Sequence, residues 1–156
     1  MRYHNKTTQY YVDPKRSIFS PSEEQVWVDI SDKVGHLIER QFIDAINQES
    51  RPDLKWPDWY VSARLATRDK DHRGIDIVVQ TKDLGCFFVQ VKSSRRYVTR
   101  FLLKSTRTRI AVVVIEPKDT AQTMRRKFFQ AARLERQWLK KRRSGERPPK
   151  ERTVVW

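Results

Sequence analysis

Asp76, Gln90 and Lys92 combine a carboxylate, an amide and an ammonium in a pattern that could carry out chemistry on a phosphodiester. They lie in or beside two apolar runs, residues 75–79 and 86–91, which flank a polar turn that contains glycine. Strand-forming residues on either side of such a turn predict a β-hairpin. Since side chains alternate along a strand, Gln90 and Lys92 share one face, and Asp76 on the neighbouring strand can meet them. Such a cluster can bind a divalent metal ion and polarise a phosphodiester.

The Gly-Ile-Asp triplet that ends at Asp76 and the Gln-Val-Lys triplet that ends at Lys92 resemble the core of PD-(D/E)xK nucleases. More narrowly, the stretch over about 34–115 is similar to Mrr-type restriction endonucleases and related nuclease-like domains. Gln stands where the usual pattern has Glu, a variant that the endonuclease subunit of some transposases shares. The resemblance implies a metal-dependent endonuclease that hydrolyses DNA, structure-specific or part of a restriction, repair or mobile-element system.

The resemblance also implies a role for each residue of this site. Asp76 and the amide oxygen of Gln90 would hold Mg²⁺ or Mn²⁺, ions that prefer oxygen ligands. The backbone carbonyl of Val91 would add a further ligand. Lys92 would orient or deprotonate the attacking water and stabilise charge that develops on the phosphate. Glu39 lies in the first long predicted helix, where the family often places a Glu that contacts the metal directly or through water.

Each of these residues also has an interpretation without catalysis. Asp76 could pair with a nearby arginine such as Arg73, and Glu39 could be a solvated helix carboxylate. Gln90 could be a strand residue bonded to a neighbour, and because it is uncharged it should lower the metal affinity relative to Glu. The alternative function is therefore a nucleic-acid-binding protein with a nuclease fold and no turnover. A basic RNA-associated protein in which the motif arises by chance is a second alternative.

The basic residues are concentrated in the C-terminal part of the chain. Residues 1–94 balance 14 Lys and Arg against 14 Asp and Glu, whereas residues 95–156 hold 19 basic and 5 acidic residues, which accounts for the net charge of +14. A block this basic attracts polyanions through counterion release and electrostatic steering. DNA is the expected partner, with RNA as the alternative, and the basic face of the last predicted helix would extend the contact. The residues expected to hold phosphates are Arg73, Arg95, Arg96, Arg100, Lys104, Arg107 and Arg109.

The hydrophobic patterning predicts an α/β fold. The expected elements are a helix over 32–48, a strand over 58–67, a loop over 68–73, the hairpin, a strand over 110–115 and a helix over 120–143. Ser31 would cap the first of these helices, and Ser20 begins a capping box for a shorter helix or turn. Residues 93–108 fit either a helix or an edge strand. This order agrees with the αβββαβ core of restriction-endonuclease-like folds, in which helices flank a mixed central sheet.

The length of 156 residues suits one domain with one modest core. We expect an N-terminal arm and short helix over 1–30, a nuclease-like domain over 31–143 and a basic tail over 144–156. No apolar run approaches the roughly 20 residues that span a membrane, and the N-terminus lacks the apolar segment of a signal peptide. The single Cys86 excludes an internal disulfide and a multi-cysteine zinc site. These points favour a cytoplasmic protein without membrane contact. The resemblance to restriction-like nucleases implies a homodimer or a place within a larger nuclease assembly.

Overall fold

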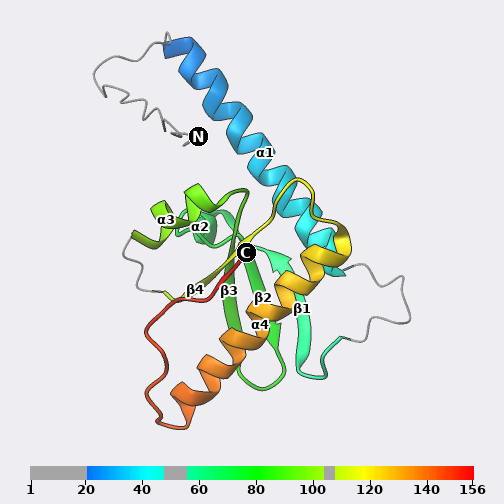
Figure 1. Ribbon diagram of the computed structural model, residues 1–156, viewed down its shortest axis with the longest axis vertical. Helices are drawn as coiled ribbons and strands as arrows, with labels where there is room; N and C mark the ends of the chain where they lie inside the picture. The colour runs from blue at the N-terminus through cyan, green and yellow to red at the C-terminus, as the bar shows by residue number, and fades with distance from the viewer. Residues whose placement is uncertain (1–20, 48–55, 104–107) are drawn as a thin grey trace, which may run out of the picture. The chain divides into compact units, whose positions relative to one another are not determined.

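The computed structural model describes residues 21–47, 56–103 and 108–156, with side chains described from residue 33 onward. The chain divides into two units, Met1–Lys33 and Val34–Trp156. Helix α1, Pro21–Asn47, begins in the first unit and ends in the second (Figure 1). The expectation of two separate helices here is wrong. Ser31 lies inside one continuous helix, because Pro21 occupies the first turn, where proline is tolerated, and no further proline follows before its end.

The second unit contains a five-stranded mixed sheet in the order β1-β2-β3-β4-β5 (Figure 1). The strands are β1 (Tyr60–Leu65), β2 (Ile77–Thr81), β3 (Cys86–Lys92), β4 (Ile110–Val114) and β5 (Val154–Val155). The first three strands pair antiparallel, and β4 and β5 continue the sheet in parallel. The predicted hairpin is confirmed as β2 and β3, with Ile77 opposite Val89. The mixed α/β architecture is therefore confirmed.

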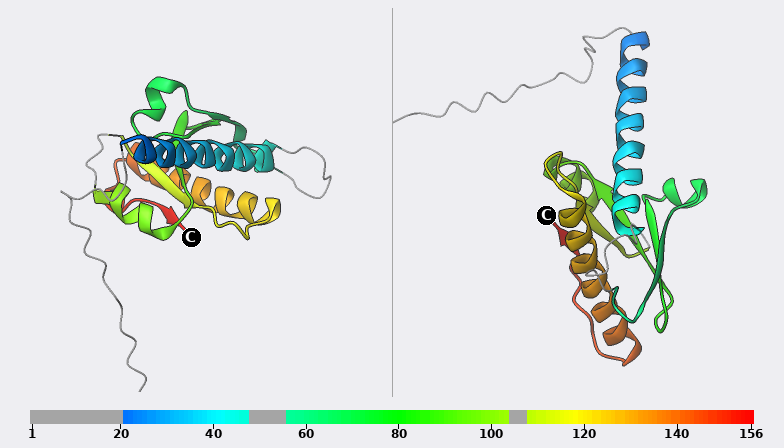
Figure 2. Two further views of the ribbon diagram at one scale, coloured as in Figure 1. Left: turned by 90° about the horizontal axis from the view of Figure 1, so that it is seen from above. Right: turned by 90° about the vertical axis from the view of Figure 1, so that its right-hand side faces the viewer.

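Helices cover both faces of this sheet. The end of α1 and helix α4, Ala121–Arg143, bury apolar side chains against one face, and Figure 2 shows α4 running along the sheet. Phe42 of α1 and Phe128 of α4 meet edge to face there, with ring centroids 6.1 Å apart. Helix α3, Arg95–Leu103, packs Val98 and Phe101 against the other face. The ambiguous segment after Lys92 is thus helical over most of its described part, because a helix buries these two residues together.

One connection carries structure that the patterning did not specify. Residues 68–73, expected to be a loop, include the one-turn helix α2, Arg68–Asp71. Helix α4 begins at the predicted place, since the hydroxyl of Thr120 accepts a hydrogen bond from the backbone N–H of Thr123 over 3.2 Å.

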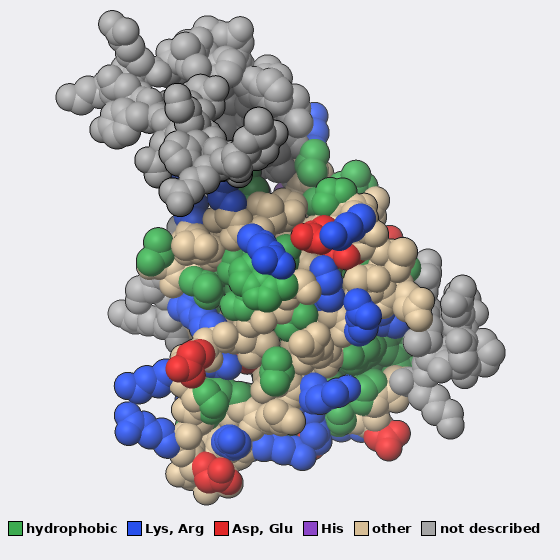
Figure 3. All heavy atoms as spheres, in the orientation of Figure 1, with side chains coloured by type: hydrophobic (Ala, Val, Ile, Leu, Met, Phe, Trp, Pro, Cys, Tyr) green, Lys and Arg blue, Asp and Glu red, His purple; other side chains and the backbone are tan. Residues whose placement is uncertain are grey.

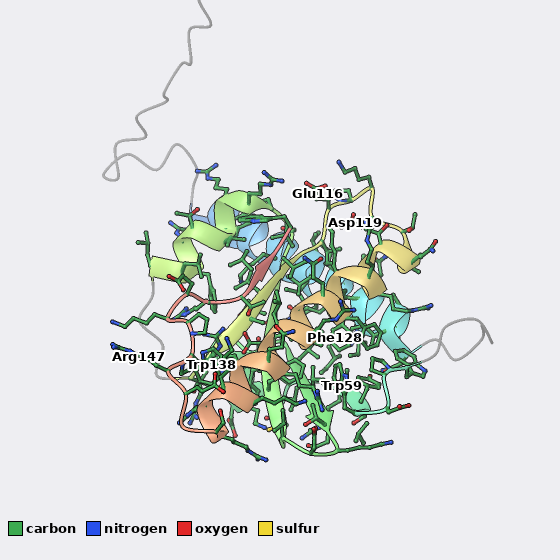
Figure 4. All side chains as sticks on the ribbon, turned by 60° about the horizontal axis from the view of Figure 1, so that its bottom comes forward. Trp59, Glu116, Asp119, Phe128, Trp138 and Arg147 are labelled. Atoms are coloured by element: carbon green, nitrogen blue, oxygen red, sulfur yellow. The ribbon has the colours of Figure 1, made fainter. Side chains whose placement is uncertain are left out.

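The C-terminal segment is not a free tail, which corrects the expectation for residues 144–156. Its end forms β5, in which Val155 is buried and pairs with Val113 of β4. Trp138, labelled in Figure 4, holds the loop that leads into β5, because its indole Nε1 donates to the carbonyl of Pro149 over 3.0 Å. A strand of two residues is too short for periodicity to reveal, and its pairing partner is remote in sequence.

Candidate functional site

Asp76 lies immediately before β2, and its carboxylate is buried against β3. Its backbone N–H donates to the carbonyl of Val89 over 3.0 Å, and its carbonyl accepts from Ala66 over 2.7 Å. Asp76 Oδ2 accepts two further hydrogen bonds, from Gln90 Nε2 at 2.7 Å and from the Val91 N–H at 2.6 Å. Asp76 is only 4% exposed. The structure therefore brings Asp76, Gln90 and Val91 together, and it rigidly orients the carboxylate.

A hollow of about 390 Å³ adjoins this carboxylate. It lies between the second-unit part of α1, the end of β1 and the segment that contains α2. Three of its lining residues are acidic, namely Glu39, Asp71 and Asp76, and two are basic, Arg40 and Arg68. An opening that combines several carboxylates with guanidinium groups offers places for both a cation and an anion.

The acidic groups in the hollow disfavour one another's negative charge. Burial, together with the charge of Glu39, raises the pKa of Asp76 from its ordinary value of 3.8 to about 7. The Val91 N–H and the Lys92 ammonium act in the opposite direction. Burial also raises the pKa of Glu39, although His36 lies 3.3 Å from it and opposes the shift. Such crowding is relieved by a bound proton or metal ion, which is typical of functional sites.

Gln90 and Gly74 fit against each other closely behind the hollow. Gln90 is buried, and within the described residues its Oε1 has no hydrogen-bond partner. Gly74 has φ +77°, and a Cβ there would lie 2.9 Å from this oxygen and 2.8 Å from Phe101 Cε2. The glycine of the Gly-Ile-Asp triplet is therefore required by both its backbone and its neighbours. An orphaned buried amide oxygen is costly, so a cation ligand would suit it.

Lys92 stands near the carboxylates but not in the hollow itself. Its ammonium lies 5.5 Å from the centroid of the Phe101 ring, and its charge lowers the pKa of both Asp76 and Glu39. Gln90, like Lys92, is not among the described residues that line the hollow. Both approach it from β3.

A metal ion at this site would need oxygen donors other than carboxylates. Within the described residues, no three His, Cys, Asp or Glu side chains are grouped closely enough to hold an ion by themselves. A metal site here would need the Gln90 amide oxygen and a backbone carbonyl in addition to Asp76 and Glu39. The orphaned oxygen of Gln90 makes this donor set chemically suitable for Mg²⁺ or Mn²⁺.

The residues expected to hold phosphates fall into three groups. Arg73, Arg95, Arg96 and Arg100 are exposed, whereas Lys104 and Arg107 lie outside the described residues. Arg109 is turned inward. Its Nε donates to Glu135 Oε2 over 2.9 Å, and its Nη1 donates to the carbonyl of Glu151 over 3.0 Å.

The inward contacts of Arg109 correct its expected role. Its guanidinium also lies 4.5 Å from the centroid of the Trp138 ring, and its side chain is only 18% exposed. The side chain of Glu135 is more deeply buried, with an exposed fraction of 3%. Arg109 therefore neutralises a buried charge and attaches the C-terminal segment, which leaves its donors little freedom to bind phosphate.

Sequence reasoning missed two basic residues and one acidic residue of the hollow, Arg40, Arg68 and Asp71. Arg40 and Arg68 are exposed, and within the described residues no hydrogen bond or ion pair engages their guanidinium groups. Arg40 directly follows Glu39, but helical spacing alone does not show which neighbour of Glu39 shares its opening. The segment 68–71 has no apolar periodicity, since its turn of helix is held by local backbone hydrogen bonds and buries none of its residues.

Comparisons with known protein families, with curated proteins and with solved structures find no match for this chain. In the part of the chain that the structure describes, no helix combines the length and the apolar character needed to cross a bilayer.

Proposed function

We propose that this chain is a metal-dependent endonuclease of the PD-(D/E)xK type, which hydrolyses DNA phosphodiester bonds. The observation that carries the proposal is the buried Asp76 carboxylate, held by Gln90 and Val91 beside Glu39 at the edge of an open hollow. The order of the longer elements supports it, since α1, β1, β2, β3, α3 and β4 follow the αβββαβ sequence of restriction-endonuclease-like folds.

The proposed metal ligands are Asp76, Glu39, the amide oxygen of Gln90 and the carbonyl of Val91. A bound Mg²⁺ or Mn²⁺ would supply a Lewis acid and lower the pKa of coordinated water. Two hydrogen bonds to Oδ2 leave Oδ1 as the oxygen of Asp76 that is available to a ligand in the hollow. Rotation of the Gln90 amide by half a turn would place Oε1 beside the carboxylate, an arrangement that a cation stabilises.

The remaining polar residues of the site would handle the substrate. The Lys92 ammonium would stabilise negative charge that develops on the phosphate. Arg40 and Arg68 line the hollow and have no hydrogen-bond or ion-pair partner among the described residues, so their guanidinium groups would hold the flanking phosphates. These contacts position a strand without reading its sequence.

A non-catalytic nucleic-acid-binding protein on the same fold is the alternative function. The specific observation that favours it is the uncharged Gln90, which bonds to Asp76 in place of a second carboxylate. With one negative charge fewer, the site would bind a divalent ion more weakly than one with Glu. The basic residues would then retain DNA while the hollow did no chemistry.

Cleavage of plasmid, linear and branched DNA in Mg²⁺ or Mn²⁺ separates these two functions. Asp76→Asn should lower the cleavage rate by about 100-fold or more. Substitution of a residue that only hydrogen-bonds to a metal ligand already costs about 10–100-fold in metal affinity or activity. Asp69→Asn is the matched control, because Asp69 is an exposed carboxylate in α2 that does not line the hollow. Equal cleavage by wild type and Asp76→Asn would contradict the proposed site. Tight duplex binding without cleavage by any form would establish the alternative.

A further inference from the structure

The solvent face of α4 is a continuous strip of basic and amide side chains, here called the α4 strip. Its exposed members are Gln122, Arg126, Gln130, Arg133, Gln137, Lys140 and Lys141. Steps of three and four residues keep them on one side of the helix, within an arc of about 100°. The buried residues Phe128 and Ala132 lie on the opposite side. The α4 strip is therefore set by the same periodicity that buries the core.

Little acidic charge lies near the α4 strip within the described part of the chain, although Lys140 interacts with the Asp83 carboxylate through its charge. Glu135 is the only acidic residue of α4, and it is buried and paired with Arg109. No hydrogen bond or ion pair among the described residues engages the side chains of Arg126, Arg133 or Lys140. Figure 3, in which α4 faces the viewer, shows Lys and Arg side chains over this surface with few acidic ones between them.

Other basic residues of α4 serve the fold, which sets the α4 strip apart from them. Arg125 donates its Nε to the carbonyl of Ala45 over 2.9 Å, and Lys127 donates its Nζ to the carbonyl of Val114 at the same distance. Both side chains are buried. Arg136 and Arg143 of α4 also have partners, since both donate to Asp83. Arg126 and Arg133 of the α4 strip differ from these four residues, because no hydrogen bond or ion pair among the described residues engages them.

The dimensions and chemistry of the α4 strip match a nucleic-acid duplex. Residues 122–140 span about 27 Å of helix, the length of about eight base pairs, and the three main cations recur every 10.5 Å or so. Arginine, lysine and glutamine all donate hydrogen bonds to phosphate oxygens. The members of the α4 strip include no aromatic residue on which an unpaired base could stack. Leu134 is the large apolar residue exposed beside them, and a single leucine is a small apolar surface for entering a membrane.

We propose that the α4 strip binds the phosphate backbone of a nucleic-acid duplex, outside the hollow at Asp76. The inference rests on the proposed function only in taking nucleic acid as the partner, and it requires no cleavage. Contact through phosphates makes this binding independent of sequence and strongly dependent on salt.

The test measures fluorescence anisotropy of labelled duplexes of about 16 base pairs, twice the length that the α4 strip covers, in EDTA across a range of salt concentrations. The variant combines Arg126→Gln, Arg133→Gln and Lys140→Gln, substitutions that keep good helix formers. The control combines Arg64→Gln, Lys82→Gln and Lys118→Gln, which remove the same charge from exposed positions elsewhere. DNA and RNA duplexes of the same sequence show whether the α4 strip binds a DNA or an RNA backbone more tightly.

The α4 variant should lower the slope of log K against log salt by about 2.7, from three lost contacts at 0.9 each, and raise Kd at low salt at least about tenfold. The control should retain the wild-type slope. An equal effect of variant and control would overturn the inference, as would tighter binding to single strands or to phosphatidylserine vesicles. If the α4 variant weakens duplex binding while wild type fails to cleave DNA, the inference stands and the proposed nuclease function falls.

Discussion

Gln90 donates its amide Nε2 to Asp76 Oδ2 over 2.7 Å, and both side chains are buried. The bond satisfies one end of the amide but leaves its Oε1 without a partner among the described residues. Burial and the nearby charge of Glu39 raise the pKa of the Asp76 carboxyl group to about 7. Both groups are therefore in an unfavourable state that a bound cation would relieve.

Asp76→Asn should make the protein more stable at pH 8. The folded-state pKa of about 7 exceeds the ordinary value of 3.8, so the folded protein holds this proton more tightly than the unfolded chain does. Stability is consequently lost as pH rises between these two values, by roughly 4 kcal/mol in total. An asparagine oxygen can accept the same two hydrogen bonds and carries no charge. Urea unfolding at pH 4 and pH 8 measures the effect, and an identical pH dependence in both proteins would rule it out.

Gly74→Ala should destabilise the fold more than an equivalent change elsewhere. Positive φ costs an alanine about 1–2 kcal/mol, and here its Cβ would also collide with Gln90 and Phe101. Gly85→Ala is the matched control, because Gly85 has φ +80° and nothing within 4 Å of the added Cβ. The difference in thermal stability between the two variants measures the cost of the collision at Gly74, because both variants carry the cost of positive φ. Equal losses of stability would show that the space around Gly74 does not matter.

Lys92→Met should alter both the rate and its pH dependence. The Lys92 charge lowers the pKa of Asp76 and Glu39, so its removal raises both values and moves the acidic limb of the rate profile to higher pH. If Lys92 also assists proton transfer, kcat should fall by about 100-fold or more. The exposed Lys82→Met provides the control. A lower rate with an unmoved acidic limb would contradict the electrostatic link.

Arg109→Ala should unfold the C-terminal segment without changing DNA binding. It would leave the buried Glu135 carboxylate uncompensated, at a cost of about 3–5 kcal/mol. The double variant Arg109→Met with Glu135→Gln should recover most of this loss, because neither buried charge remains. Denaturant unfolding and the salt slope of duplex binding are the two measurements. A smaller salt slope with normal stability would restore Arg109 to the phosphate-binding set.

The predictions from local pattern succeeded where the stabilising contacts are themselves local. The hairpin of β2 and β3 follows from alternating strand formers around a turn, and the start of α4 follows from the Thr120 cap. Alternation also brought Asp76 and Gln90 to the same end of that hairpin. The catalytic and metal-binding roles of these residues stay predictions.

Long-range contacts decided the features that the patterning left open or missed. The segment after Lys92 became helix α3 because Val98 and Phe101 could be buried on the second face of the sheet. Strand β5 formed because β4 offered a free edge and Arg109 linked its neighbours to Glu135.

The amino-acid sequence by itself determined the hairpin, helix α4 and the excess of basic charge, since each depends on neighbouring residues or on composition. Only the tertiary structure decided which charges are free. It buried Arg125, Lys127 and Arg109 against specific acceptors and left the α4 strip in solvent. It also assembled the hollow from α1, β1 and the α2 segment. The physical reason is that burial and pairing depend on elements distant along the chain, which no local period encodes.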